Sequence, residues 1–148
     1  QDMYQKVLEL FDWAHMVIMN SAVSDYKPAS FYEGKLKKQE SLTLHLVKNP
    51  DILSELGKIK KDKILVGFAL EEEERLLQEG LRKLKEKNLD LLVANPLQMM
   101  GSEEYRAVLL FKDGTKEELY ASSKLLGAEL LVKKLLEKLL KLPAQSPQ

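Results

Sequence analysis

The chain has no cysteine among its 148 residues. This excludes a disulfide framework, a thiolate nucleophile and a cysteine-ligated zinc site, and it suits a reducing cytoplasm. Neither sign of charge is in excess, because 23 basic residues balance 23 acidic ones. No global field would therefore draw the protein to nucleic acid or to an anionic membrane, and a bound anion must be held by a local cluster of cations.

Long apolar runs are missing too. The longest uncharged run falls well short of the ~20 residues that span a bilayer, and the first residues lack the basic-then-apolar order of a signal peptide. Apolar residues still make up 45% of the chain, enough for one domain with a real core. We therefore expect one cytoplasmic domain over residues 1–142, without internal repeats, and a disordered tail at 143–148.

Short apolar runs alternate with helical stretches along the chain. Buried parallel strands are predicted at residues 15–19, 64–70 and 89–94, helices at 3–13, 49–57, 71–87 and 123–140, and a hairpin at 105–111 and 116–120. Alternating strands and helices indicate an α/β protein. We expect a Rossmann-like three-layer fold with a mainly parallel sheet, followed by a C-terminal β-hairpin and helix.

Helix and turn signals refine this map. Asn49 is the expected cap of the second helix, with Pro50 at its first position. The acidic residues 71–74 are interpreted as ordinary stabilisation of the next helix, and Asp113-Gly114 as the hairpin turn. The leucine stripe of the last helix is expected to pack on the sheet, with a coiled-coil partner as the alternative.

Five short blocks follow one another in a fixed order. They are Asn-Ser-Ala-Val-Ser-Asp-Tyr-Lys-Pro at 20–28, Lys-Leu-Lys-Lys-Gln at 35–39, Lys-Asn-Pro-Asp-Ile-Leu at 48–53, Val-Gly-Phe-Ala at 66–69, and Lys-Asn-Leu-Asp at 87–90 leading to Ala94-Asn95. In this order they resemble phosphopantothenoylcysteine synthetase, the phosphopantothenate–cysteine ligase domain of a bacterial bifunctional coenzyme A biosynthesis flavoprotein. The resemblance covers most of residues 16 to 120. The family's N-terminal strand and Gly/Ser-rich loop have no counterpart in residues 1–20, so we expect only the C-terminal, CTP-binding part of the domain.

The resemblance also implies an activity. Such ligases activate 4'-phosphopantothenate with CTP as an acyl-cytidylate and couple it to L-cysteine, with Mg²⁺ as the accompanying ion. No residue of this chain is assigned as a metal ligand, and FMN would belong only to a fused upstream decarboxylase. The family further implies a homodimer through residues 35–47, whose apolar-polar alternation at 41–47 predicts a protruding strand. The CTP-over-ATP preference stays open.

Three of the blocks lie at or just after the carboxyl ends of predicted strands, where an open parallel sheet binds its ligands. The resemblance assigns twelve residues to the nucleotide: Met19, Asn20, Ser21, Asp25, Lys35, Pro50, Asp51, Ile52, Leu53, Phe68, Lys83 and Lys87. Residues 19–21 would present backbone groups to the base, although the family more often has small residues there. Residues 50–53 would offer a helix N-terminus to ribose or phosphate. Lys35 is also implicated in forming the activated intermediate.

Each assignment has a structural alternative. Lys35 and its neighbours also suit a solvated strand edge, Lys83 and Lys87 an ordinary helix surface, Asp25 an Asx-turn cap, and Phe68 the core. The histidines at 15 and 45 are interpreted as structural. The second functional hypothesis is a non-catalytic nucleotide-binding or dimerisation module. A generic dehydrogenase domain is excluded, because no G-x-G-x-x-G follows a strand.

Overall fold

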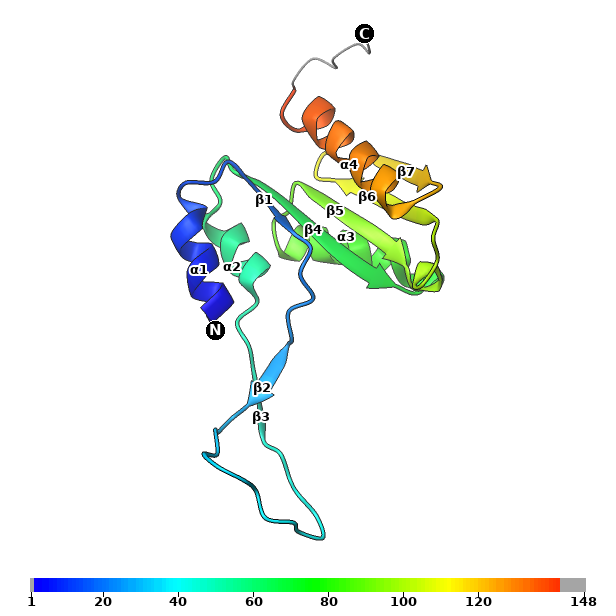
Figure 1. Ribbon diagram of the computed structural model, residues 1–148. Coiled ribbons are helices and arrows are strands. Elements are labelled where there is room, and N and C mark those ends of the chain that lie inside the picture. The colour runs from blue at the N-terminus through cyan, green and yellow to red at the C-terminus, as the bar shows by residue number, and fades with distance from the viewer. Residues whose placement is uncertain (1, 142–148) are drawn as a thin grey trace.

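A five-stranded sheet forms the centre of the protein, which we describe from a computed structural model covering residues 2–141 (Figure 1). Its strand order is β1-β4-β5-β6-β7. Strands β1 (Met16–Met19), β4 (Ile64–Glu71) and β5 (Leu91–Pro96) run parallel, and β6 (Tyr105–Phe111) and β7 (Lys116–Ala121) add an antiparallel hairpin. The hairpin turn has Gly114 at φ 90°, a conformation that suits glycine.

Helices cover both faces of this sheet (Figure 1). Helices α1 (Asp2–Phe11), α2 (Ile52–Ile59) and α3 (Leu76–Glu86) pack on one face, and α4 (Lys124–Lys138) packs on the other. Alternate residues of β4 explain the two cores, because Leu65 faces the first group of helices while Val66 faces α4. The expected Rossmann-like three-layer fold is confirmed.

A long excursion leaves the sheet after β1. Strands β2 (Tyr26–Pro28) and β3 (Leu46–Lys48) form a short antiparallel ladder, and residues 29–45 between them contain neither helix nor strand. We call residues 26–48 the arm. It extends away from the sheet (Figure 1), and every residue from 28 to 48 is exposed. The strand predicted at 41–47 is therefore wrong except for its last two residues.

Three further expectations need correction. Strand β1 was expected to be buried on both faces, but it is the edge of the sheet and Ile18 is 46% exposed. The acidic run does not open a helix: Glu71 ends β4, and Glu73–Arg75 form the 3-10 turn η1 before α3. Both histidine side chains are exposed rather than packed. The predicted tail at 143–148, and residue 142, lie outside the described residues.

The start of α2 also differs from the prediction. Asp51, not Asn49, caps this helix, since its carboxylate accepts a hydrogen bond of 3.1 Å from the Ser54 amide. Pro50 therefore precedes the cap instead of occupying the first helical position. Asn49 is drawn elsewhere: its side-chain amide donates to the Ser24 carbonyl at 2.8 Å and its backbone amide donates to the Asp25 carbonyl at 2.7 Å.

Candidate functional site

A polar pocket of about 400 Å³ lies beyond the carboxyl ends of β1 and β4. Six segments build it: the loop after β1, the two strands of the arm, the N-terminus of α2, strand β4 and the end of α3. This is where an open α/β sheet binds its ligands. We call it the polar pocket. Its lining residues are Met19, Ser21, Val23, Ser24, Asp25, Tyr26, Lys48, Asn49, Pro50, Asp51, Ile52, Leu53, Phe68 and Lys87.

Asn49 holds the shape of this pocket. Its two hydrogen bonds to the backbone of Ser24 and Asp25 tie the loop after β1 to the segment that enters α2. With its backbone fixed in this way, Asp25 carries a carboxylate that makes no hydrogen bond or ion pair to any residue between 2 and 141. The Asx-turn alternative for Asp25 is therefore not what the structure has, and the carboxylate lines the pocket.

Asp51 links the helix cap to the cations of the site. Its carboxylate lies 3.1 Å from the Lys87 ammonium and also accepts the Ser54 amide. Partial burial acts to raise the pKa of Asp51, but the hydrogen bonds from Ser54 and then Lys87 outweigh it and hold the pKa below its usual value. Asp51 therefore stays ionised at neutral pH and keeps the Lys87 ammonium at the N-terminus of α2.

Lys87 reaches the pocket because two backbones touch. A Cβ on Gly57 of α2 would overlap the Lys87 carbonyl oxygen, so only glycine admits this approach. Asn88 follows the C-cap of α3 with φ 52°, and its side chain donates to the Gly57 carbonyl at 2.8 Å. The Lys-Asn pair of the motif is thus explained by a helix-to-helix junction that aims the lysine at Asp51.

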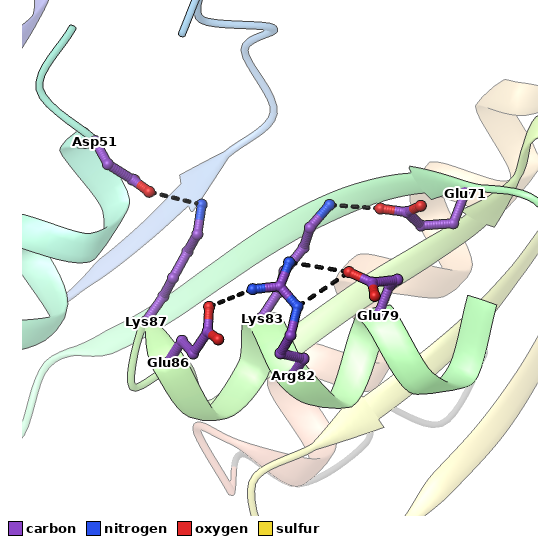
Figure 2. Close-up of polar contacts among 7 residues, drawn as sticks. All are labelled: Asp51, Glu71, Glu79, Arg82, Lys83, Glu86 and Lys87. Atoms are coloured by element: carbon purple, nitrogen blue, oxygen red, sulfur yellow. Dashed lines mark hydrogen bonds and ion pairs between the residues drawn. The ribbon is translucent and has the colours of Figure 1, made fainter. Parts of the chain in front are cut away.

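The cations of α3 point in two directions (Figure 2). Arg82 pairs with Glu79 and Glu86 of its own helix, at 2.9 and 2.5 Å. Lys83 and Lys87 instead reach carboxylates of other elements, Lys83 contacting Glu71 at 2.6 Å and Lys87 contacting Asp51. Both lysine side chains are only about a quarter exposed, 27% and 26%. The interpretation as ordinary surface lysines therefore fits neither of them.

The structure brings most of the predicted site residues together. The polar pocket is lined by nine of the twelve: Met19, Ser21, Asp25, Pro50, Asp51, Ile52, Leu53, Phe68 and Lys87. Asn20 lines a neighbouring pocket, together with Met19, Ser21 and Phe68. Lys83 lines neither pocket and is held by Glu71, while Lys35 lies on the arm, likewise outside both. Phe68 also packs against the core cluster under α4, so its structural interpretation holds, while its contact with a nucleotide stays a prediction.

Lys48 is a lining residue that the sequence reasoning missed. Its ammonium makes no ion pair within the described part of the chain, and it lines the pocket beside Asn49. Its place directly before the Asn-Pro-Asp segment was a usable signal. The neighbouring pocket, of about 590 Å³, was missed as well. We call it the apolar pocket; it extends from the same wall towards α4 and is lined mainly by apolar side chains.

A metal site made by the protein alone is not present among residues 2–141, since no three His, Cys, Asp or Glu residues there are placed to hold an ion. Within the same residues, no helix has the length and apolar character needed to cross a membrane. The arrangement suits an anion with its own counter-ion: ammonium groups, a helix N-terminus and one carboxylate without a partner in the described part of the chain meet in one pocket.

Residues 1–139 match the family described as the DNA/pantothenate metabolism flavoprotein C-terminal domain. The chain belongs to this family. It is 42% identical over 129 residues to the coenzyme A biosynthesis bifunctional protein CoaBC of Bacillus subtilis, covering 84% of this chain and 32% of the relative. Against the same protein of Methanocaldococcus jannaschii it is 34% identical over 143 residues, covering 93% and 35%. The five blocks thus identified the family correctly.

Solved structures agree with this assignment. The crystal structure of the C-terminal domain of CoaBC matches with a TM-score of 0.73 and 29% identity, over 95% of this chain and 62% of that one. A Cab2 mutant in complex with phosphopantothenate-cysteine matches with a TM-score of 0.67 at 18% identity, over 91% of this chain and 48% of that one, which shows a shared fold. The chain spans about a third of the length of the curated family members it matches.

Proposed function

We propose that this chain is the CTP-binding part of a phosphopantothenate–cysteine ligase and that CTP occupies the polar pocket. The observation that carries the proposal is that three groups meet in one pocket beyond the strand ends: the helix N-terminus capped by Asp51, Lys87, and the Asp25 carboxylate, which has no partner among residues 2–141. Membership of the coenzyme A biosynthesis family supports the substrate class. The volume of about 400 Å³ falls within the range of small-molecule sites, ~300–1,000 Å³.

We assign a part of the nucleotide to each side of the polar pocket. The backbone of Met19 and Ser21 and the ring of Phe68 take the base, since they line the pocket on the side of β1 and β4. The free N–H groups at the start of α2 and the ammonium groups of Lys48 and Lys87 take ribose and phosphate oxygens. Lys83 approaches the outer phosphates only by leaving Glu71, because it is paired in the structure described.

Mg²⁺ fits this arrangement as the companion of the triphosphate. Asp25 supplies the one lining carboxylate without a partner among residues 2–141, and Mg²⁺ commonly binds one or two carboxylates together with substrate phosphates. Its chemistry there would be neutralisation of phosphate charge. The protein's own part is to hold the triphosphate through the helix N-terminus and the lysines.

The proposed reaction has two balanced steps. The carboxylate of 4'-phosphopantothenate forms a bond to the α-phosphorus of CTP, and the bond to the leaving pyrophosphate breaks. The amine of L-cysteine then attacks the acyl carbonyl, forms the amide and releases CMP together with a proton. Both steps depend on positioning and on neutralising anions, which lysines and a helix N-terminus do without a catalytic histidine.

Lys35 is proposed to act at the site of a second copy of the chain. It lies on the arm, which leads away from the sheet (Figure 1), and it does not line the polar pocket of its own chain. The arm also exposes large apolar side chains that a partner would cover, among them Phe31 at 89% and Leu44 at 64%. Leu44→Asp is expected to shift the protein from dimer to monomer in sedimentation, whereas Leu125→Asp on α4 is not. If the wild-type protein is a monomer at micromolar concentration, the arm does not have this role.

Ligase chemistry is tested in the protein with a complete ligase domain. Single-turnover release of pyrophosphate from CTP and 4'-phosphopantothenate should fall roughly a hundredfold in Lys35→Gln, since one charge-assisted contact to the transition state is lost. The fold should be spared, with unfolding free energy changed by less than ~0.5 kcal/mol. Lys37→Gln, a neighbour on the same arm, serves as the control. CTP binding without any pyrophosphate release by the wild-type protein would favour the non-catalytic nucleotide-binding module.

A further inference from the structure

We propose that a third pocket, between α3 and the turn of the β6–β7 hairpin, binds a small amphiphilic anion: an apolar chain that ends in a carboxylate or phosphate group. The pocket has a volume of about 680 Å³, and we call it the α3 groove. None of its lining residues lines the polar or the apolar pocket, so it is a separate site. They are Gln78, Leu81, Arg82, Leu84, Lys85, Asn88, Leu89, Phe111, Lys112 and Gly114.

The α3 groove follows the helix axis. Four of its lining residues, at positions 78, 81, 82 and 85, are spaced by three and four residues and therefore share one face of α3. From position 78 to position 85 the helix rises about 10 Å, at about 1.5 Å per residue. The volume falls within the range of small-molecule sites, ~300–1,000 Å³. An extended chain therefore suits the groove better than a compact ring.

The apolar part of the groove comes from three leucines and a phenylalanine. Leu84 and Leu89 belong to the core and are 6% and 1% exposed. Phe111 lies at the end of β6. Leu81, in contrast, is 41% exposed although its side chain is large and apolar. An apolar chain in the groove removes this leucine surface from water, which favours binding.

The charged side chains of the groove are all cationic. Within the described part of the chain no acidic residue lines it, whereas Arg82, Lys85 and Lys112 do. Arg82 is neutralised by two glutamates of its own helix (Figure 2). Lys85 makes no ion pair with any residue between 2 and 141, and in the same residues the Lys112 ammonium contacts only the neutral side chain of Asn88, at 3.3 Å. Two ammonium groups without a carboxylate partner favour an anionic head group.

The hairpin turn holds Lys112 in place at the groove. Its backbone amide donates to the Asp90 carbonyl at 2.9 Å. The turn then closes on itself, since the Gly114 amide donates to the Phe111 carbonyl at 3.0 Å. A site whose backbone is already fixed loses less conformational freedom when a ligand binds.

The test uses the 148-residue chain, labelled with ¹⁵N, and titrations with decanoate, decyl phosphate and decyltrimethylammonium below their micelle concentrations. At least one of the two anions should shift the amide signals of Leu81, Lys85, Lys112 and Gly114 in a saturable way, and the cation should not. The anion that binds more tightly identifies the head group.

Two leucines of α3 provide a matched pair of variants. Leu81→Asp should weaken the anion at least about tenfold, because it places a negative charge on the apolar wall. Leu77→Asp, one turn earlier, 43% exposed and outside the groove, should leave the affinity unchanged. Both positions are exposed, so neither variant should prevent folding.

A second set of variants tests the head group. Lys85→Gln and Lys112→Gln, combined in one protein, should weaken the anion about tenfold or more, since its charge-assisted contacts are lost. Lys116→Gln, at the start of β7 and outside the groove, is the control.

Several results would overturn the proposal. They are equal binding of the cation and the anions, no saturable shifts, shifts confined to the polar or apolar pocket, and equal effects of Leu77→Asp and Leu81→Asp. If the groove signals of the unliganded protein shift as its concentration is raised, a second copy of the chain covers the groove and the proposed ligand is wrong. None of these results depends on CTP, so they leave the proposed function untouched.

Discussion

Two lysine–aspartate pairs serve the protein in different ways, although each takes one member from the block at residues 87–90. Lys60 and Asp90 meet at 2.8 Å with side chains 5% and 20% exposed, and the same Asp90 oxygen accepts the Leu65 amide at 2.8 Å. Lys87 and Asp51 meet at 3.1 Å at the pocket rim, 26% and 43% exposed. The first pair joins α2, β4 and β5, while the second remains accessible to a ligand. One sequence block, Lys-Asn-Leu-Asp, thus contributes both to the scaffold and to the site.

Breaking the buried pair should have the largest effect. Asp90→Ala leaves the Lys60 ammonium buried without its carboxylate and removes the acceptor of the Leu65 amide. We expect the free energy of unfolding to fall by about 3–5 kcal/mol, measured by urea denaturation. Asp90→Asn, which keeps an acceptor oxygen, should cost less. A loss below ~1 kcal/mol for the alanine variant would mean that this pair does not hold the scaffold.

The junction between scaffold and rim should come next. Alanine is normally preferred to glycine inside a helix by about 1 kcal/mol. At Gly57 the added methyl group would meet the Lys87 carbonyl, so Gly57→Ala should instead destabilise by about 1–3 kcal/mol. It should also weaken CTP binding, because Lys87 is displaced. Lys58→Ala, on the exposed side of the same helix, is the control. A stabilised Gly57→Ala protein would contradict the close approach.

The rim cations should affect binding more than stability. Lys87→Ala and Lys83→Ala should each weaken CTP about tenfold, and CMP less, because the outer phosphates lose a cation. Their unfolding free energy should change by about 1 kcal/mol or less, as for partly exposed pairs. Arg82→Ala is the matched control, since the ion pairs of Arg82 with Glu79 and Glu86 lie within its own helix (Figure 2). If calorimetry shows equal losses of affinity for CTP and CMP, these lysines do not contact the outer phosphates.

The smallest expected effect is the loss at acid pH of the stability that the Asp51 carboxylate contributes. Its pKa is lowered in the folded state, so its contribution to stability is complete above the unfolded value near 3.8 and is lost as the pH falls through the folded pKa. The difference in unfolding free energy between Asp51→Asn and the wild type should therefore become smaller at low pH. At neutral pH the loss should be within ~1 kcal/mol, because asparagine also caps helices. A difference independent of pH would show that the charge is irrelevant to the cap.

The sequence allowed the sheet and the location of the polar pocket to be predicted, because local signals sufficed. Apolar runs located β1, β4 and β5 within about two residues, and Asp113-Gly114 with Ser123 located the hairpin and the last helix. The rule that open parallel sheets bind ligands at their strand ends then predicted a common site, and most of the assigned residues line one pocket.

What the sequence did not predict depends on contacts distant in the chain. Asn49 and Asp51 are both capping residues, and Asp51 caps α2 because Asn49 is held by the loop after β1. Lys83 forms an ion pair with Glu71, which lies on a strand rather than on the same helix as Lys83. The alternation at 41–47 does not form a long strand, because within the described chain no sheet covers its apolar side. The apolar pocket is assembled from four separated segments and leaves no local pattern.

The most direct test of CTP in the polar pocket is a pair of calorimetric titrations of the wild-type chain with CTP and UTP in magnesium buffer. If backbone groups of residues 19–21 read the 4-amino group of cytosine, UTP leaves a buried acceptor unpaired at a cost of ~1–3 kcal/mol. We predict that CTP binds about tenfold more tightly or better. Equal affinities, or no heat with either nucleotide, would contradict the account of the pocket.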